Sequence, residues 1–219
     1  MNPKERLILG TVLPFLFLLN VAGCDVEFGS GDSGGGGTST TEAELSGEVY
    51  EVNSGDDVEG ITVGLEDENS GNTYEDTTDS GGGFKITGGF CGTSTVTLTD
   101  AEGTRLAVFS LDVIPGSDTD IGSLTVSSGT VTFEDEIITE FDGYVTENDC
   151  DGTSGTLTVE VDNDCDTVNV LVTVTRSTNV TDGEDNIDCD EINTGAGVQI
   201  YGGMSVGSGV EGYDIEVTD

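Results

Sequence analysis

Three acidic turns carry the residues whose types and spacing could do chemistry. Each places a cysteine next to aspartates, at residues 148–151, 163–166 and 187–190. Carboxylates at alternate positions are typical of calcium loops, because Ca²⁺ takes roughly six to eight oxygen ligands. Cysteines in secreted chains form disulfides by default. The two chemistries to weigh here are therefore calcium binding and disulfide formation.

The calcium hypothesis concerns the carboxylates of the first two turns. They are Glu147, Asp149, Asp151, Asp162, Asp164 and Asp166. The first turn begins like an EF-hand loop, but Thr158 stands at its last ligand position and cannot supply the bidentate carboxylate. The second turn lacks the glycine that should follow Asp166. Solvated Asp-rich β turns explain both, so we expect no cofactor and keep calcium binding as an alternative.

The disulfide hypothesis follows from the strand between two of the cysteines. Cys150 and Cys165 flank a predicted strand at 156–161. Such a strand spans roughly 20 Å, whereas a disulfide joins Cα atoms about 6 Å apart. Cys189 follows the return strand and so comes back toward Cys150. We therefore predict a Cys150–Cys189 disulfide, with Cys91 and Cys165 either free or bridging two domains.

The composition argues against an enzyme. The chain has no histidine, which removes the usual base of nucleophilic triads and the commonest zinc ligand. A Ser–Lys dyad would have to use Lys85, the only lysine after the first few residues, and no motif supports it. Carboxylate pairs occur throughout the chain and so identify no site. We expect a non-catalytic protein and keep an enzyme only as the least favoured alternative.

The N-terminal segment has the layout of an export leader. Lys4 and Arg6 precede an apolar stretch at 7–19, which is short for a membrane span. The sequence Val-Ala-Gly-Cys at 21–24 resembles the lipobox of bacterial lipoproteins. That resemblance implies cleavage between Gly23 and Cys24 and attachment of a diacylglycerol to the Cys24 thiol. It places the mature chain in the cell envelope, anchored to a membrane and facing the periplasm or the exterior.

The chain after the leader is flexible at first and strongly acidic throughout. Residues 1–23 form the signal peptide, and residues 24–42 form a Gly- and Ser-rich linker with the lipidated cysteine. The whole chain has 44 acidic and 5 basic residues, a net charge of −39. It therefore repels nucleic acid. Besides the membrane, we expect an envelope protein, a glycan or a cationic molecule as partner.

Short alternating segments in residues 43–127 predict an antiparallel β-sandwich. They lie at 45–50, 61–65, 84–86, 96–98, 106–109 and 121–126. The stretches LSGEVYE (45–51), VEGITVGL (58–65) and TTDSGGGFKITGGFCGTSTVTL (77–98) resemble the carboxypeptidase regulatory-like domain, a transthyretin-like sandwich. That family implies a non-catalytic accessory domain. Strand alternation also predicts that Lys85 points outward between Phe84 and Ile86.

Residues 130–219 predict a small barrel of five or six strands. The strands lie at 130–133, 141–145, 156–161, 168–174, 197–203 and 213–217. The phrases VLVTVTRSTNV, TGAGVQIYGGM and GYDIEVTD resemble an uncharacterised bacterial secreted domain with an OB-like barrel. OB barrels often bind nucleic acid, but that use needs a basic groove beside stacking aromatics. Tyr144, Tyr201 and Tyr213 have no such basic neighbours in the sequence, so we reject it.

Together these features predict an all-β, lipid-anchored envelope or surface protein. Its expected function is binding, adhesion or structural support, carried out without catalysis. A concave, aromatic-lined surface would favour binding, and a bare barrel with an exposed sheet edge would favour assembly.

Overall fold

The computed structural model describes most of the chain after the leader and linker. The described residues are 42–53, 58–90, 92–162, 167–183, 185–205 and 209–218. They form β-strands joined by turns and one short 3₁₀ helix, which confirms the all-β prediction. Among them, no helix has the length and apolar character needed to span a membrane. The predicted signal peptide, Cys24 and all of the linker except residue 42 lie outside the described residues.

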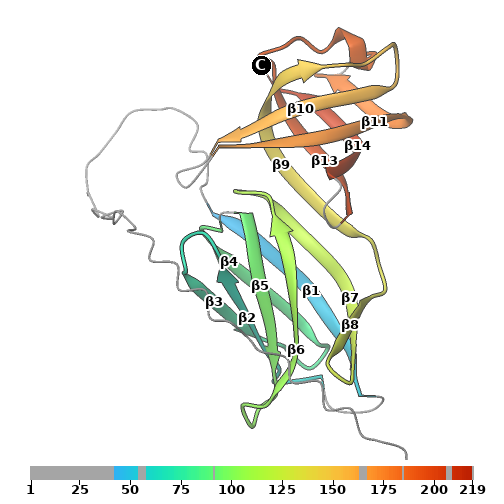
Figure 1. Cartoon of the computed structure of the whole chain (residues 1–219). Helices are drawn as coiled ribbons and strands as arrows, with labels where there is room; N and C mark the ends of the chain where they lie inside the picture. Colours follow the sequence, from blue (N-terminus) through green and yellow to red (C-terminus); the bar gives the residue numbers. More distant parts are fainter. Residues whose placement is uncertain are drawn as a thin grey trace, which may run out of the picture. The chain divides into compact units, whose positions relative to one another are not determined.

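The first group of strands forms two sheets (Figure 1). One is a separate four-stranded sheet in the order β3 (Thr73–Thr77), β2 (Thr62–Asp67), β5 (Gly92–Thr99) and β6 (Arg105–Val113). The other contains β4 (Gly83–Gly88), β1 (Ala43–Val52), β7 (Asp118–Ser127) and β8 (Thr130–Phe133). β1 and β7 run parallel, whereas the other neighbours are antiparallel.

Alternation along these strands separates core from surface. Val63 and Leu65 of β2, and Val96 and Leu98 of β5, are buried, while the residues between them are more exposed. Lys85 points outward as predicted: its side chain is 63% exposed, and its Nζ forms an ion pair with Oε2 of Glu44. The apolar residues of one strand face thus form the core.

The second group of strands closes into a five-stranded barrel. Its strands are β9 (Ile137–Asn148), β10 (Gly155–Asp162), β11 (Thr167–Asp182), β14 (Gly209–Val217) and β13 (Gly197–Ser205). Each pairs with the next, and β13 pairs back with β9. β11 and β14 are parallel. The short β12 (Asp185–Asn186) pairs with β11, and the 3₁₀ helix η1 (Cys189–Glu191) follows it.

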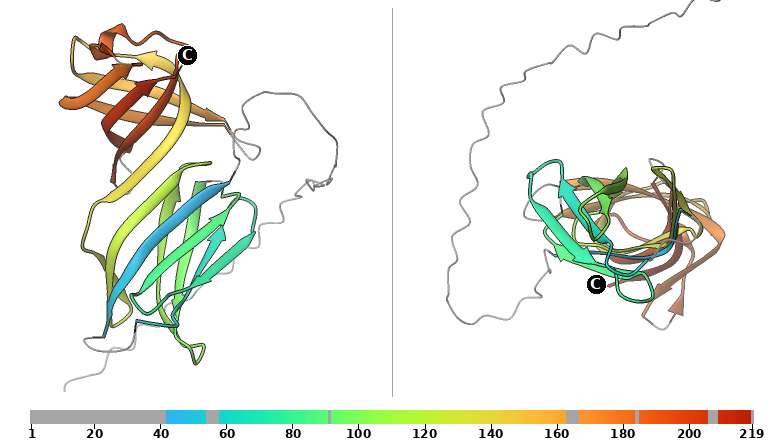
Figure 2. Two further views of the ribbon diagram at one scale, coloured as in Figure 1. Left: turned by 180° about the vertical axis from the view of Figure 1, so that it is seen from behind. Right: turned by 90° about the horizontal axis from the view of Figure 1, so that it is seen from below.

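β9 also belongs to the sheet that contains β7 (Figure 2). Residues 118–120 of β7 pair with residues 138–140 of β9. On the buried side of this pairing, the hydroxyls of Thr119 and Thr139 lie 3.3 Å apart, and the Thr119 hydroxyl lies 3.0 Å from that of Ser117. These hydroxyls satisfy one another, which removes the cost of burying them singly.

The strand at 130–133 differs from the sequence-based expectation. The pattern grouped it with the barrel, but β8 pairs with β7 through Leu124 and Phe133. Phe133 also packs edge-on against Phe109 of β6, with ring centroids 5.3 Å apart. The reason is a tight turn: Ser128 and Gly129 adopt positive φ angles and fold β8 back onto β7.

Candidate functional site

The structure contains a disulfide between Cys150 and Cys189, the pairing that the strand lengths predicted. Their Cα atoms lie 5.8 Å apart, within the normal range for a disulfide. The Asn148 side-chain amide donates to the main-chain oxygens of Cys189 (2.9 Å) and Ile192 (2.8 Å). The bridge and this amide together join the end of β9 to η1. Cys91 and Cys165 lie outside the described residues, so their state stays a prediction.

The acidic turns do not assemble a metal centre within the described part of the chain. Glu147 accepts a hydrogen bond from the Thr158 hydroxyl, and Asp162 accepts one from Thr167. Asp151 forms a main-chain bridge with Ser154. Among the described residues, no three Asp, Glu or Cys side chains are grouped so that they could hold an ion. Asp164 and Asp166 lie outside the described residues.

A different set of side chains gathers on the outward face of the ten-stranded sheet, which contains β7 and the barrel strands. Cross-strand pairing aligns Asp118 (β7), Glu140 (β9), Tyr201 (β13) and Asp214 (β14) in one row. A second row aligns Asp120, Ile138, Gly203 and Glu211 on the same four strands. Together with Tyr213 of β14, we call these nine residues the acidic face. Apart from Gly203, which has no side chain, and the partly exposed Ile138 and Tyr213, its members are solvent-exposed.

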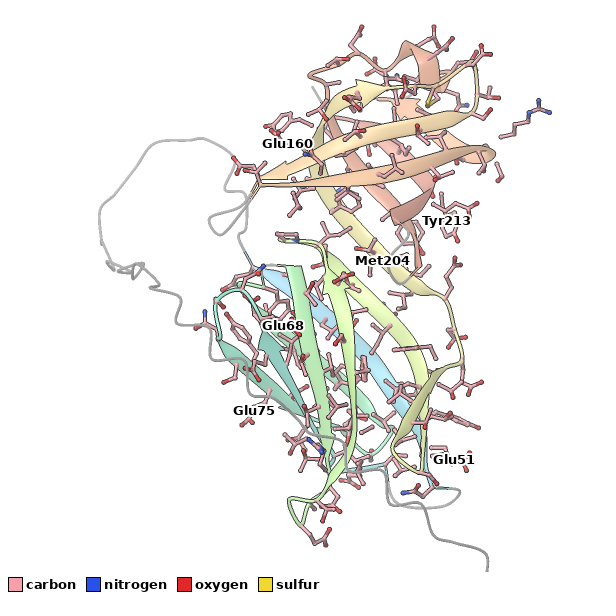
Figure 3. All side chains as sticks on the ribbon, in the orientation of Figure 1. Glu51, Glu68, Glu75, Glu160, Met204 and Tyr213 are labelled. Atoms are coloured by element: carbon pink, nitrogen blue, oxygen red, sulfur yellow. A yellow bond between two sulfur atoms is a disulfide. The ribbon has the colours of Figure 1, made fainter. Side chains whose placement is uncertain are left out.

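A β-bulge brings Tyr213 onto the acidic face. Tyr201 pairs with Asp214, but the next residue, Gly202, pairs with Gly212, which leaves Tyr213 as the extra residue of β14. Such a bulge re-aims a side chain. The Thr178 hydroxyl donates to the Gly212 main-chain oxygen at 2.6 Å and so satisfies a group beside the bulge. Figure 3 shows Tyr213 projecting from the outside of the barrel strands.

Tyr213 is held in place by a hydrogen bond to Glu136, and this pair lies against Gly203. The Tyr213 hydroxyl donates a hydrogen bond to the Glu136 carboxylate, and this bond is the main reason why the pKa of Tyr213 rises to about 12. Partial burial and nearby negative charge raise it further. A Cβ atom on Gly203 would overlap both the Tyr213 hydroxyl and the Glu136 carboxylate. Gly203 is thus the residue that leaves room for this pair.

Tyr201 completes the aromatic part of the face. Its side chain is 41% exposed, and its ring centroid lies 6.3 Å from that of Tyr213. It also forms one wall of a shallow hollow of about 230 Å³, together with Ser46, Asp118, Asp120 and Glu140. An exposed tyrosine beside carboxylates can bind another group in two ways: the ring offers an apolar contact surface, and its electron-rich face attracts cations.

Sequence reasoning found the tyrosines but not this arrangement. Alternation along 197–203 indicates that Tyr201 lies on the side opposite Ile200. Nothing local indicates that β13 lies between β9 and β14, or that Tyr213 is an extra residue. Searches with this chain find no matching family model, no matching curated protein and no matching solved structure. The proposed function therefore depends on the residues themselves.

Proposed function

We propose that this chain is a non-catalytic, lipid-anchored protein of the cell envelope or surface that binds a partner through its β-sheet body. The observation that carries the proposal is the pair Tyr201 and Tyr213 on an acidic, outward sheet face. Exposed aromatic side chains with adjacent polar groups are enriched in binding surfaces. The hydrogen bond to Glu136 restrains Tyr213, which lowers the entropy cost of ordering it in a complex.

The anchoring part of the proposal comes from the leader. An apolar stretch followed by residues 21–24 supports lipid attachment at Cys24. The Gly- and Ser-rich segment after Cys24 has the composition of a flexible spacer between a membrane and a folded body. A lipid anchor and a flexible spacer would keep the binding surface at the membrane, where it can reach a partner, and would prevent the protein from diffusing away.

We also propose finer identities for the two strand groups. The sheets β4-β1-β7-β8 and β3-β2-β5-β6, with β1 and β7 parallel, support the carboxypeptidase regulatory-like, transthyretin-like sandwich. The closed ring β9-β10-β11-β14-β13, with β11 and β14 parallel, supports an OB-like barrel. Neither family identity implies a catalytic activity, which agrees with the proposed role.

Anchoring is tested by metabolic labelling with a radioactive or clickable fatty acid. We expect label on the wild-type chain and none on Cys24→Ser, with the variant released from the membrane fraction. Cys165→Ser is the matched control, and it should keep both label and membrane association. Labelling of Cys24→Ser at the wild-type level would refute the anchor.

Binding is tested by crosslinking in the intact envelope, followed by solubilisation and capture of the full-length chain. The capture is made with calcium and with a chelator, because the Asp-rich turns leave calcium binding as the alternative. We expect a reproducible crosslinked partner in both conditions. A partner seen only with calcium would favour the calcium-dependent alternative, and the absence of any partner would refute a binding role.

A further inference from the structure

The acidic face has the charge needed to receive basic side chains. Its carboxylates are Asp118, Asp120, Glu140, Glu211 and Asp214. Among the described residues, none of these five forms an ion pair with a lysine or arginine. Negative charges that share one sheet face repel one another, so a basic side chain bound among them relieves the repulsion as well as adding attraction.

The two tyrosines add a component that charge alone lacks. A guanidinium or ammonium group over a tyrosine ring gains a cation–π interaction, which strengthens as the contact is desolvated. Tyr201 presents its ring beside the hollow lined by Asp120 and Glu140. Tyr213 lies next to it, with its hydroxyl already bonded to Glu136. The partly exposed ring of Tyr213 is therefore the part left for a partner.

The dimensions of the face suit an extended segment. Strands in a sheet are about 4.8 Å apart, so a row across the four strands from β7 to β14 runs roughly 14 Å. An extended chain rises about 3.3 Å per residue and turns alternate side chains to one side. A segment of roughly five residues, with basic side chains at alternate positions, can therefore place two or three of them along one row.

The neighbouring strand limits where a basic segment can lie. Beyond β7, Asp120 is level with Ser46 of β1, and Ser46 with Lys85 of β4. Lys85 is already paired with Glu44. A basic segment that extended toward Lys85 would meet a positive charge there, and the carboxylate of Glu44 is already paired. The segment is therefore expected to extend from β7 toward β14.

A second copy of this chain does not fit the face. Each copy carries a net charge of −39, and after the leader its basic residues are only Lys85, Arg105 and Arg176. Two acidic faces would repel each other, and no basic stretch of the body is available to occupy one. Charge complementarity therefore points to a different, basic protein.

We propose that the acidic face binds an extended, arginine- or lysine-rich segment of a partner protein, with a basic side chain over Tyr201 and its neighbours on the flanking carboxylates. This inference rests on the proposed binding function and names the class of partner. Arginine suits the face better than lysine, because its planar guanidinium stacks on tyrosine and bonds carboxylates through two donors.

The test is a titration of the full-length lipidated chain, in a non-ionic detergent, with fluorescent peptides. The probes are an oligoarginine, an oligolysine and an acetylated oligolysine of equal length, followed by fluorescence anisotropy. We expect binding in the order arginine, then lysine, with the acetylated peptide not binding. Affinity should fall as NaCl is raised, because salt screens exposed charges.

Two pairs of matched variants locate the binding. Tyr201→Ala should weaken oligoarginine binding by roughly threefold or more, whereas Tyr50→Ala should leave it unchanged, although Tyr50 is 65% exposed. Glu140→Gln with Glu211→Gln should weaken it by about fivefold. The control removes the same charge from the four-stranded sheet through the exposed Glu66 and Glu75 and should have little effect. Thermal melting verifies that each variant is folded.

The outcomes separate this inference from the proposed function. Equal losses in the two double variants would mean general attraction to a polyanion, and absence of peptide binding would overturn the inference directly. If the envelope partner is still captured by Tyr201→Ala and by Glu140→Gln with Glu211→Gln at the wild-type level, the binding function holds and the acidic face is not its surface. If the wild-type chain captures nothing, the binding function itself fails.

Discussion

The four-stranded sheet and the barrel are both built from strands that alternate between core and solvent, but they differ in how regularly the strands pair. In the sheet, β2 pairs with β3 and β5 without a register shift, and β5 with β6 has a single one. In the barrel, three of the strand pairs contain a shift. Closing a small sheet on itself requires such irregularities, because the strands must bend and twist strongly.

This difference places the functional candidates in the barrel and at its junction with β7. A regular strand only alternates between core and solvent, whereas a bulge moves one side chain out of that alternation. Tyr213 reaches the acidic face in this way. Gly202 allows the main chain of β14 to come close, and Gly203 leaves room for Tyr213 and Glu136. We therefore expect small substitutions to lower the free energy of unfolding more in the barrel than in the four-stranded sheet.

The largest expected effect comes from removing the disulfide of the barrel. Cys150→Ser with Cys189→Ser opens a bridge between residues 39 positions apart. A closed loop of this length predicts a loss of about 4 kcal/mol in the free energy of unfolding. Chemical denaturation measures the loss. Relative to the wild type, the amide hydrogen-exchange rate should rise more in the barrel strands β9 to β14 than in β2 and β5. An equal rise in both groups would contradict the comparison.

A matched pair of glycine substitutions tests the same contrast at the level of one methyl group. A Cβ on Gly202 would overlap the main-chain oxygen of Glu211, whereas a Cβ on Gly64 of β2 would lie 3.8 Å from the nearest atom, the Thr97 oxygen. We expect Gly202→Ala to lower the free energy of unfolding by about 2 kcal/mol and Gly64→Ala to change it by less than about 0.5 kcal/mol. If the two substitutions lowered the free energy of unfolding by similar amounts, the barrel would accommodate an added methyl group as readily as the sheet does.

The smallest effect is a shift in one tyrosine titration. Tyr213 has its pKa raised from 10.0 to about 12 by the hydrogen bond to Glu136. Since the folded pKa is the higher one, the stabilisation is complete below pH 10 and is lost as the pH rises toward 12. Absorbance at the tyrosinate band should show a late step that disappears in Tyr213→Phe and moves to lower pH in Glu136→Gln. Tyr50→Phe is the control and should keep the late step.

Several features could be predicted from the sequence because they depend on near neighbours in the chain. Alternation predicted the strands and the outward direction of Lys85. The length of the strand between Cys150 and Cys165 excluded that pairing and favoured Cys150–Cys189. The strand at 130–133 was found but grouped with the barrel strands, whereas it pairs with β7, because its pattern does not reveal that the turn at Ser128 and Gly129 folds it back onto β7.

The sequence by itself determined that this is a strongly negative chain of alternating strands with no histidine, and it predicts a leader that ends just before Cys24. These are properties of composition and of residues close together in the chain. Only the tertiary structure decided that Asp118, Glu140, Tyr201 and Asp214 become neighbours, and that Tyr213 joins them. The physical reason is that cross-strand register depends on how the sheet closes and where it bulges, and both are set by packing between strands far apart in the chain.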